Sequence, residues 1–229
     1  MTMTTAPRAI LFDLDGTLAD TAPDLAAAVN LLRTARGLPP TAYDILRPTA
    51  SAGARGMIGA SFGVKPDDDA YAELRDGFLD NYAAAIAVHS SLFPGVVELL
   101  DGIEAVGLRW GVVTNKPARF TDPLLPQIGL GHAACVVSGD TTAHAKPHPA
   151  PLLEAAARLD LAPEQCWYVG DDLRDIQAGK AAAMPTIAAG WGYCGPVEPL
   201  AWQADHLLAG PLEILVLLQN VLSTQAIAA

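Results

Sequence analysis

The chain has 229 residues, of which 51% are hydrophobic, and this content supports a substantial packed core and excludes a disordered chain. Acidic residues outnumber basic residues by 25 to 14, so the formal net charge is −11. This excess argues against sequence-independent binding to nucleic acid or to an anionic membrane surface. A phosphate site here must be built from local positive features: a metal ion, a few Lys or Arg side chains, and backbone N–H groups.

The N-terminal segment and the cysteines indicate an ordinary intracellular protein. No apolar run is long enough to cross a membrane. The segment before the first predicted strand lacks the charged and apolar regions of a signal peptide, so we expect a cytoplasmic location. Cys135, Cys166 and Cys194 show no C-x-x-C spacing, and neither a disulfide framework nor a zinc site is predicted.

Short apolar runs rich in Val and Ile alternate with helical patterns along most of the chain. The runs predict strands at residues 9–13, 110–114, 135–138, 166–169, 186–188 and 205–208. Apolar residues spaced three and four apart predict helices at residues 95–106, 151–159, 173–182 and 212–222. The alternation predicts an α/β fold, in which a Rossmann-like, mostly parallel sheet has helices on both faces.

The interval from about residue 21 to 89 departs from this alternation, because it contains no convincing strand. Its patterns predict several helices, separated by the turn-forming segments GLPP, SAGARG and VKPDDD. We therefore expect an all-helical cap domain over residues 21–89, inserted after the first strand. Residues 1–20 and 90–229 would then form the core.

The first predicted strand, in ILFDLDGTL, ends in two carboxylates two residues apart. If the strand continued, Asp13 and Asp15 would point to the same face and repel each other. Gly16 allows the chain to turn sharply at this point. The pair therefore needs a feature that offsets the repulsion.

Polar side chains also follow other predicted strands. The candidate residues at strand ends are Asp13, Asp15, Thr114, Asn115, Lys116, Asp171, Asp172 and Asp175, and Lys146 precedes a predicted helix. Ligands of open parallel sheets bind at the carboxyl ends of the strands, so we expect these residues at one sheet edge. The acids after the fourth strand, taken alone, would be explained by helix capping.

The ordered motifs D-x-D-G-T, T-N, K-P and G-D-x-x-x-D resemble those of the haloacid dehalogenase superfamily of phosphotransferases. The resemblance covers the whole chain, and the helical insert lies where that family places its cap. FDLDGTLADTAPD, VVTNKP and VGDDLRDIQAGKAA are similar to the phosphoglycolate phosphatase branch. GLPP, SAGARGM, HSSLFPG and WGVVTNKPARF are closer still to the N-acetylmuramic acid 6-phosphate phosphatases.

The resemblance implies a phosphomonoester hydrolase that acts through an aspartyl-phosphate intermediate on 2-phosphoglycolate or N-acetylmuramic acid 6-phosphate. Asp13 would attack phosphorus, and Asp15 would protonate the leaving oxygen and then activate water. Lys146 would neutralise the nucleophile and the transferred group. Thr114, through its hydroxyl, and Asn115, through its backbone N–H, would hold phosphate oxygens.

The resemblance also implies a Mg²⁺ cofactor, which would cancel most of the charge of the acidic pair. Its ligands would be Asp13, the backbone carbonyl of Asp15, and Asp171. Asp175 would be a further ligand or would orient a metal-bound water.

Substrate choice would depend on the cap, in which Arg55 is the best candidate to reach a substrate carboxylate or phosphate. Glycines precede and follow it in SAGARG, which makes a close approach to the substrate plausible. The alternative, a surface arginine at the beginning of a helix, has equal weight. Lys116, Asp172, Trp191 and Tyr193 border the predicted site without an assigned role.

Two alternatives to the phosphatase stay open. A phosphosugar mutase of the same superfamily would share the core motifs. A non-catalytic phosphometabolite-binding protein would be expected to lack one of Asp13, Asp15, Lys146 or Asp171, all of which are present. The expected partner is a small phosphate monoester, with no nucleic acid or membrane, and the sequence identifies no interface for an oligomer.

Overall fold

The computed structural model describes residues 6–228, with side chains as far as residue 224. A six-stranded sheet forms the centre of the molecule, and every neighbouring pair of strands is parallel. In spatial order the strands are β5 (Val136–Val137), β4 (Arg109–Val113), β1 (Ala9–Phe12), β6 (Cys166–Gly170), β7 (Thr186–Ala189) and β8 (His206–Leu208). The predicted parallel α/β fold and its six strands are therefore confirmed.

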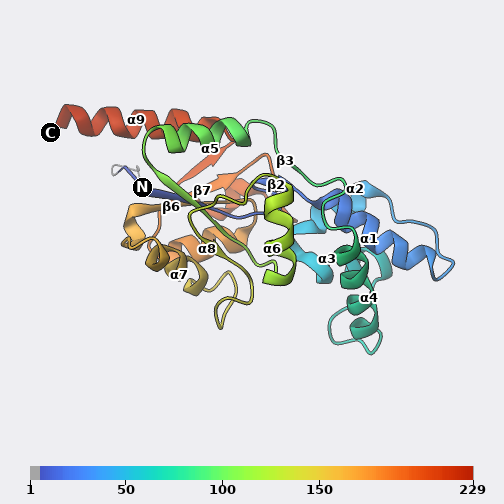
Figure 1. Cartoon of the computed structure of the whole chain (residues 1–229). Coiled ribbons are helices and arrows are strands. Elements are labelled where there is room, and N and C mark those ends of the chain that lie inside the picture. The colour runs from blue at the N-terminus through green and yellow to red at the C-terminus, as the bar shows by residue number, and fades with distance from the viewer. Residues whose placement is uncertain (1–5, 229) are drawn as a thin grey trace.

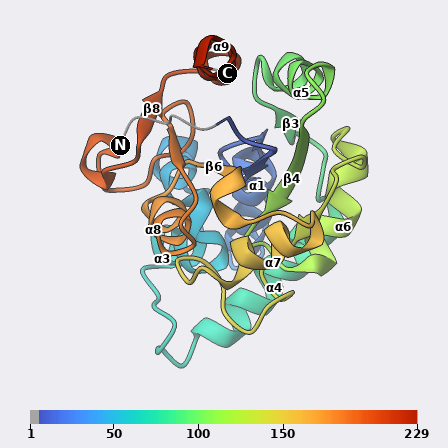
Figure 2. The same cartoon turned by 90° about the vertical axis from the view of Figure 1, so that its left-hand side faces the viewer.

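Helices cover both faces of the sheet, as the sequence predicted (Figures 1 and 2). One layer contains α5 (Val96–Ala105) and α9 (Glu213–Ala228), and the other contains α7 (Ala150–Arg158) and α8 (Leu173–Ala181). Short 3₁₀ helices, η2 (Pro163–Gln165) and η3 (Pro199–Trp202), precede β6 and β8. No helix in the described part of the chain is long and apolar enough to cross a membrane.

The central strand β1 is apolar throughout because it is buried on both faces. Ile10 and Phe12 belong to the apolar cluster that includes α5 and α9. Ala9 and Leu11 belong to the cluster that includes α7 and α8. Alternate side chains of a strand point to opposite faces, so this single strand anchors both helical layers and delivers the residues that follow it to the sheet edge.

One helix beside the site was not predicted. α6 (Ala118–Gln127) follows β4 and contains Pro123 and Pro126, which interrupt the usual helical pattern. Its apolar side chains Phe120 and Leu124 are buried in the main core. Packing against that core therefore stabilises a helix that local propensity disfavours.

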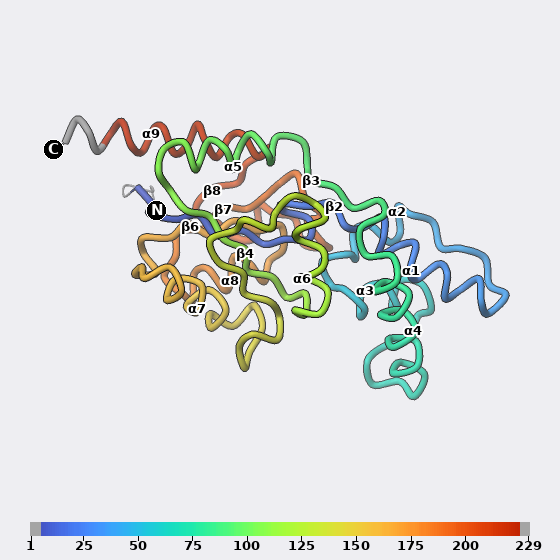
Figure 3. The backbone as a smooth tube through the Cα atoms, viewed as in Figure 1, coloured from blue at the N-terminus to red at the C-terminus, as the bar shows by residue number. Residues whose placement is uncertain are grey.

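The insert after β1 is helical, as expected. It contains α1 (Ala22–Thr34), α2 (Tyr43–Leu46), the 3₁₀ helix η1 (Arg47–Ala52), α3 (Gly53–Phe62) and α4 (Tyr71–Ala84). The two chain crossings between core and insert, β2 (Ala19–Asp20) and β3 (Ser91–Leu92), pair antiparallel and lie side by side (Figure 3). We propose residues 21–89 as a separate cap domain, with residues 1–20 and 90–229 as the core.

A buried carboxylate holds the returning crossing in place. Asp24 in α1 is only 2% exposed. It accepts hydrogen bonds from the backbone N–H groups of His89 and Ser90, at 3.0 and 2.8 Å, and from the Ser90 hydroxyl, at 2.7 Å. The first helix of the insert is thereby joined to the segment that leaves it.

We predict that Asp24→Ala lowers the free energy of unfolding by about 1–3 kcal/mol, because it leaves these donors without their acceptor. Urea denaturation measures the change. Asp44→Ala, at an exposed position of α2, is the control and should stay within about 0.5 kcal/mol of wild type. Equal small effects of both substitutions would contradict the role of Asp24.

Candidate active site

A cavity of about 330 Å³ lies between the sheet edge and the insert. Side chains that follow β1, β4 and β6 line it from the core, and residues of α1, η1, α3 and α4 line it from the insert. The predicted site residues that face it are Asp13, Asp15, Arg55, Thr114, Asn115, Lys146 and Asp175. Asp171 is fully buried and does not line the cavity.

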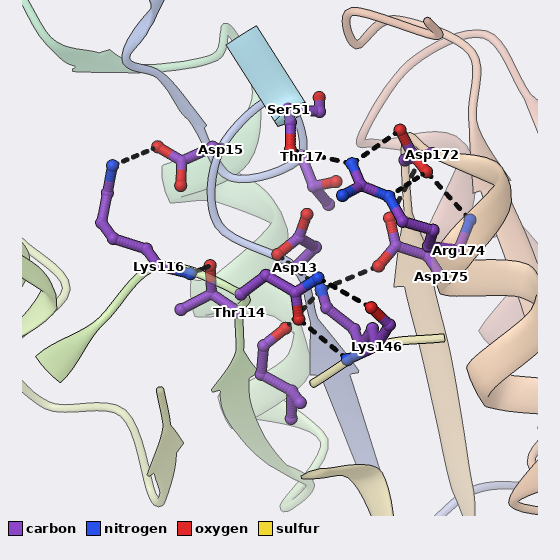
Figure 4. A network of polar contacts seen from close by, with 12 residues as sticks. Asp13, Asp15, Thr17, Ser51, Thr114, Lys116, Lys146, Asp172, Arg174 and Asp175 are labelled. Carbon is purple, nitrogen blue, oxygen red and sulfur yellow. Dashed lines mark hydrogen bonds and ion pairs between the residues drawn. The ribbon is translucent and has the colours of Figure 1, made fainter. Parts of the chain in front are cut away.

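Lys146 organises the acidic cluster at the base of this cavity. Its Nζ lies 2.8 Å from Oδ1 of Asp13 and 2.8 Å from Oδ1 of Asp175. It also donates hydrogen bonds of 2.8 Å to the carbonyl of Val113 and to the hydroxyl of Tyr168, while Figure 4 shows it between Asp13 and Asp175. Four oxygen atoms from four segments therefore fix one buried ammonium group beside Asp13.

Burial shifts the protonation equilibria of this cluster. It raises the pKa of Asp13 to about 7, although the Lys146 charge opposes the shift. Burial is the main cause, and repulsion from Asp13 the second, that raises the pKa of Asp171 well above its usual range. Burial disfavours the charge on Lys146, but Asp13 and Asp175 outweigh it and raise the pKa of that amine. Burial and mutual repulsion thus favour the protonated forms of Asp13 and Asp171, and a further positive charge bound beside them would oppose this.

The donor set fits a divalent metal ion. Asp13, Asp171 and Asp175 each offer a carboxylate oxygen, and these atoms all lie within 4.8 Å of one another. All three residues are buried. Hard divalent cations prefer oxygen ligands, and such a charge would offset the repulsion within the cluster. The side chain of Asp15 is not part of this group, so its contribution through the backbone carbonyl stays a prediction.

Asp171 is held by core and insert together. Its Oδ1 accepts a 3.0 Å hydrogen bond from the Thr17 hydroxyl, and its Oδ2 accepts from the backbone N–H of Tyr193 at 3.0 Å and from the Ser51 hydroxyl at 3.2 Å. Gly16 has a φ of +91°, and a Cβ there would lie 2.1 Å from Oδ2 of Asp171. Glycine is therefore required where the chain turns after Asp15.

The carboxylate of Asp15 faces Lys116. Lys116 Nζ lies 2.9 Å from Oδ1 of Asp15, and the Thr21 hydroxyl donates to the same oxygen. The Lys116 ammonium also donates a 3.0 Å hydrogen bond to the hydroxyl of Tyr82 in α4. Burial disfavours its charge, but the Asp15 carboxylate outweighs this and raises the pKa of Lys116. The structure thus joins Lys116, which had no assigned role, to a predicted catalytic acid.

The residues after β4 hold the loop that carries Lys146. The Asn115 side chain donates to the Lys146 carbonyl and accepts from the Lys146 backbone N–H, both at 2.9 Å. Sequence reasoning assigned Asn115 only a backbone role, although an amide can donate and accept at once. The Thr114 hydroxyl lines the cavity and accepts a 3.1 Å hydrogen bond from the Lys116 backbone N–H.

The acids that begin α8 combine capping with contacts to the site. Asp172 is the N-cap and accepts from the backbone N–H of Arg174 at 2.9 Å, while Asp175 accepts from the backbone N–H of Asp172 at 3.1 Å. Arg174, which sequence reasoning missed, donates a 2.8 Å hydrogen bond to the Ser51 carbonyl in the insert. The capping interpretation of this segment is therefore correct for Asp172, whereas Asp175 also contacts Lys146.

Arg55 provides an uncompensated positive charge at the cavity. It lies in α3, is exposed, and lines the cavity from the insert. Within the described part of the chain, its side chain forms no hydrogen bond or ion pair. Its guanidinium is therefore available for an anionic ligand.

The comparisons with known proteins agree with this geometry. A family model described as haloacid dehalogenase-like hydrolase matches residues 7–183. The chain belongs to this hydrolase family. The resemblance noted in the sequence is thereby confirmed at the level of the family.

Individual relatives cover nearly the whole chain. The phosphoglycolate phosphatase of Xanthomonas campestris pv. campestris (strain 8004) is 48% identical over 91% of this chain and 95% of its own. The N-acetylmuramic acid 6-phosphate phosphatase of Pseudomonas putida is 43% identical over 94% and 97%. The crystal structure of a predicted phosphoglycolate phosphatase from Haemophilus somnus 129pt has a TM-score of 0.82 and 27% identity, covering 93% and 98%.

Two aromatic residues of this haloacid dehalogenase-like hydrolase contact the segment after β1 and do not line the cavity. Trp191 donates its indole N–H to the Thr17 carbonyl at 2.9 Å. The Tyr193 hydroxyl donates to Asp20 at 2.8 Å and accepts from the backbone N–H of Thr21, also at 2.8 Å. Both are therefore positioned to support the site and the crossing into the insert.

We predict that Mg²⁺ raises the melting temperature of the wild-type protein relative to EDTA, because a cation that binds the folded cluster stabilises it. The free energy of unfolding rises by about 2.7 kcal/mol when the concentration of free Mg²⁺ is a hundred times its dissociation constant. Asp171→Asn should remove most of the shift, and thermal unfolding with and without Mg²⁺ measures it. Asp101→Asn makes an equal charge change on the exposed face of α5 and should keep the shift in melting temperature. An unchanged shift in Asp171→Asn would contradict Asp171 as a metal ligand.

Proposed function

We propose that this protein is a Mg²⁺-dependent phosphatase that cleaves a small phosphate monoester bearing a carboxylate, through an aspartyl-phosphate at Asp13. The broader statement, a phosphoric monoester hydrolase, follows from its family and its phosphatase relatives. The observation that carries the proposal is the position of Asp13, which opens onto the cavity and has Lys146 Nζ 2.8 Å from its carboxylate.

In the proposed reaction, a carboxylate oxygen of Asp13 bonds to phosphorus as the bond to the leaving oxygen breaks. Asp15 gives that oxygen a proton and later takes one from the water that hydrolyses the acyl phosphate. Lys146 is held by Asp175, Tyr168 and the Val113 carbonyl, so it keeps Asp13 in one orientation and neutralises the phosphoryl group without rearranging.

Further groups around Asp13 complete the proposed site. The Thr114 hydroxyl and the Asn115 backbone N–H would hold phosphoryl oxygens. Asp13, Asp171 and the backbone carbonyl of Asp15 would hold Mg²⁺, which supplies positive charge to polarise the phosphoryl group. Residues of the insert line the cavity opposite the acidic cluster, where they would reduce the contact of a bound substrate with bulk water.

Two substrates match these features: 2-phosphoglycolate and N-acetylmuramic acid 6-phosphate, each with one phosphate and one carboxylate. The free guanidinium of Arg55 suits an anionic group of either, the phosphate or the carboxylate. The cavity volume of about 330 Å³ and its apolar residues Leu25, Phe78, Leu79 and Phe120 favour the sugar acid, because its carbon skeleton can contact them. A two-carbon acid would leave much of this surface without a contact.

The experiment that tests the proposal is phosphate release from both esters, measured side by side with Mg²⁺ and with EDTA. We predict that Asp13→Asn lowers kcat by about 10⁴-fold or more, since the nucleophile is lost. Asp101→Asn is the matched control and should retain wild-type kcat. Appreciable turnover by Asp13→Asn would contradict the nucleophile, and phosphoryl transfer to a sugar hydroxyl in place of water would favour the mutase.

We also predict that Arg55→Met raises KM for both acids by about tenfold or more, because one charge-assisted contact is worth ~1.5–3 kcal/mol. The effect on kcat should be smaller, since within the described residues no hydrogen bond or ion pair joins the Arg55 side chain to Asp13, Lys146 or Asp175. Arg75→Met is the control, because Arg75 lies in α4, is exposed, and is outside the cavity lining. Equal KM values for Arg55→Met and wild type would exclude Arg55 as a substrate ligand.

A further inference from the structure

Lys116 connects a catalytic carboxylate of the core with the insert. Its Nζ lies 2.9 Å from Asp15 Oδ1 and 3.0 Å from the Tyr82 hydroxyl. The ammonium also lies 4.7 Å from the centre of the Tyr82 ring, within the range of a cation–π contact. A single charge therefore bridges the loop after β1 and helix α4.

The position of Tyr82 is itself fixed by packing. Tyr82 is 2% exposed. Its ring stacks on Phe78 of the same helix, with centroids 6.4 Å apart, and meets Phe120 of α6 at 5.4 Å. Because these rings come from both sides of the cavity, Tyr82 holds the Lys116 ammonium at the boundary between core and insert.

Lys116 and the Thr21 hydroxyl, which donates to the same oxygen, together direct the Asp15 carboxylate. In Figure 4 it is directed toward Lys116 and away from Asp13. The side chains of Lys116 and Asp15 are 7% and 13% exposed, so solvent screens their attraction only weakly. To serve a leaving oxygen bound at Asp13, Asp15 must turn away from Lys116, and separating a buried pair without a replacement partner is unfavourable.

Lys116 also faces the cavity, as Asp15 does. A substrate that carries a second anionic group can bring that group to Lys116 and replace Asp15 as the partner of the ammonium. An ester without a second anion offers no replacement. The exchange therefore raises the turnover of substrates that carry a second anionic group. It acts after binding, at the step in which Asp15 transfers a proton.

We propose that Lys116 is a positioning and specificity-determining residue, which holds Asp15 turned from Asp13 until a second anionic group of the substrate takes its place at Lys116. This inference rests on the proposed phosphatase function and concerns its choice among phosphate monoesters. The ligand chemistry is a carboxylate on the same molecule as the phosphate.

Arg55 and Lys116 have separable effects under this proposal. The Arg55 side chain forms no hydrogen bond or ion pair within the described residues and is exposed, so an anion can bind there without breaking an existing pair. Loss of the Arg55 charge therefore raises KM. Lys116 already has Asp15 as its partner. Replacing Asp15 by the second anion of the substrate frees Asp15 for proton transfer, so a change at Lys116 alters kcat.

The test compares each acid, 2-phosphoglycolate and N-acetylmuramic acid 6-phosphate, with its own carboxamide, which keeps the shape and removes the charge. For wild type we expect a higher kcat on the acid. In Lys116→Met the ratio of kcat on acid to kcat on carboxamide should fall about tenfold or more, a change of about 1.4 kcal/mol. Turnover of the carboxamide should rise, because Asp15 is no longer held by Lys116.

Lys65→Met is the matched control, since Lys65 is an exposed lysine of the insert outside the cavity lining. It removes the same charge and should keep the wild-type ratio. Circular dichroism and thermal unfolding establish that each variant is folded. If Lys116→Met does not fold, Lys116→Gln replaces it, because glutamine retains a donor for Tyr82 and lacks the charge; the same fall in ratio is expected.

The outcomes separate the inference from the function on which it rests. A wild-type ratio that persists in a folded Lys116→Met or Lys116→Gln would overturn the inference alone. A fall in the ratio with an equal fall in Lys65→Met would also overturn it, because long-range charge would then be the cause. No phosphate release from any ester by the wild-type protein would overturn the proposed function itself.

Discussion

The ion pair between Lys146 and Asp13 is the interaction on which the geometry of the site depends. Lys146 Nζ lies 2.8 Å from Asp13 and from Asp175, and it also binds Val113 and Tyr168. One buried charge therefore joins the ends of β1 and β4 to β6 and α8. Without it, carboxylates at the end of a fully buried strand would repel one another and favour their protonated forms.

The residues proposed for catalysis and those proposed for substrate choice come from different parts of the chain and line one cavity. The core supplies the acidic cluster, whereas the insert supplies a free arginine and apolar side chains. Contacts from the insert reach the core directly, because Ser51 donates to Asp171 and accepts from Arg174. Insert and core therefore share hydrogen bonds at the cluster. A substrate bound between them would lie close to buried charges, where electrostatic interactions are strong.

Strand periodicity and motif order were sufficient to predict which residues gather at the sheet edge, because parallel strands end on the same side. The structure places Asp13, Asp171 and Asp175 together there. It also contains features that local patterns do not reveal, such as α6 with its two prolines and the short β2–β3 pair. Both depend on packing against segments distant in sequence, which overrides weak local propensity.

The sequence by itself determined the parallel α/β fold, the helical insert and the family, because hydrophobic periodicity and short motifs are local properties of the chain. Only the tertiary structure decided which charges pair. Lys116 faces Asp15 and Tyr82, and Asn115 holds the backbone of Lys146. Such pairing depends on distances between side chains from remote segments and on burial that removes solvent screening, and neither quantity exists until the chain has folded.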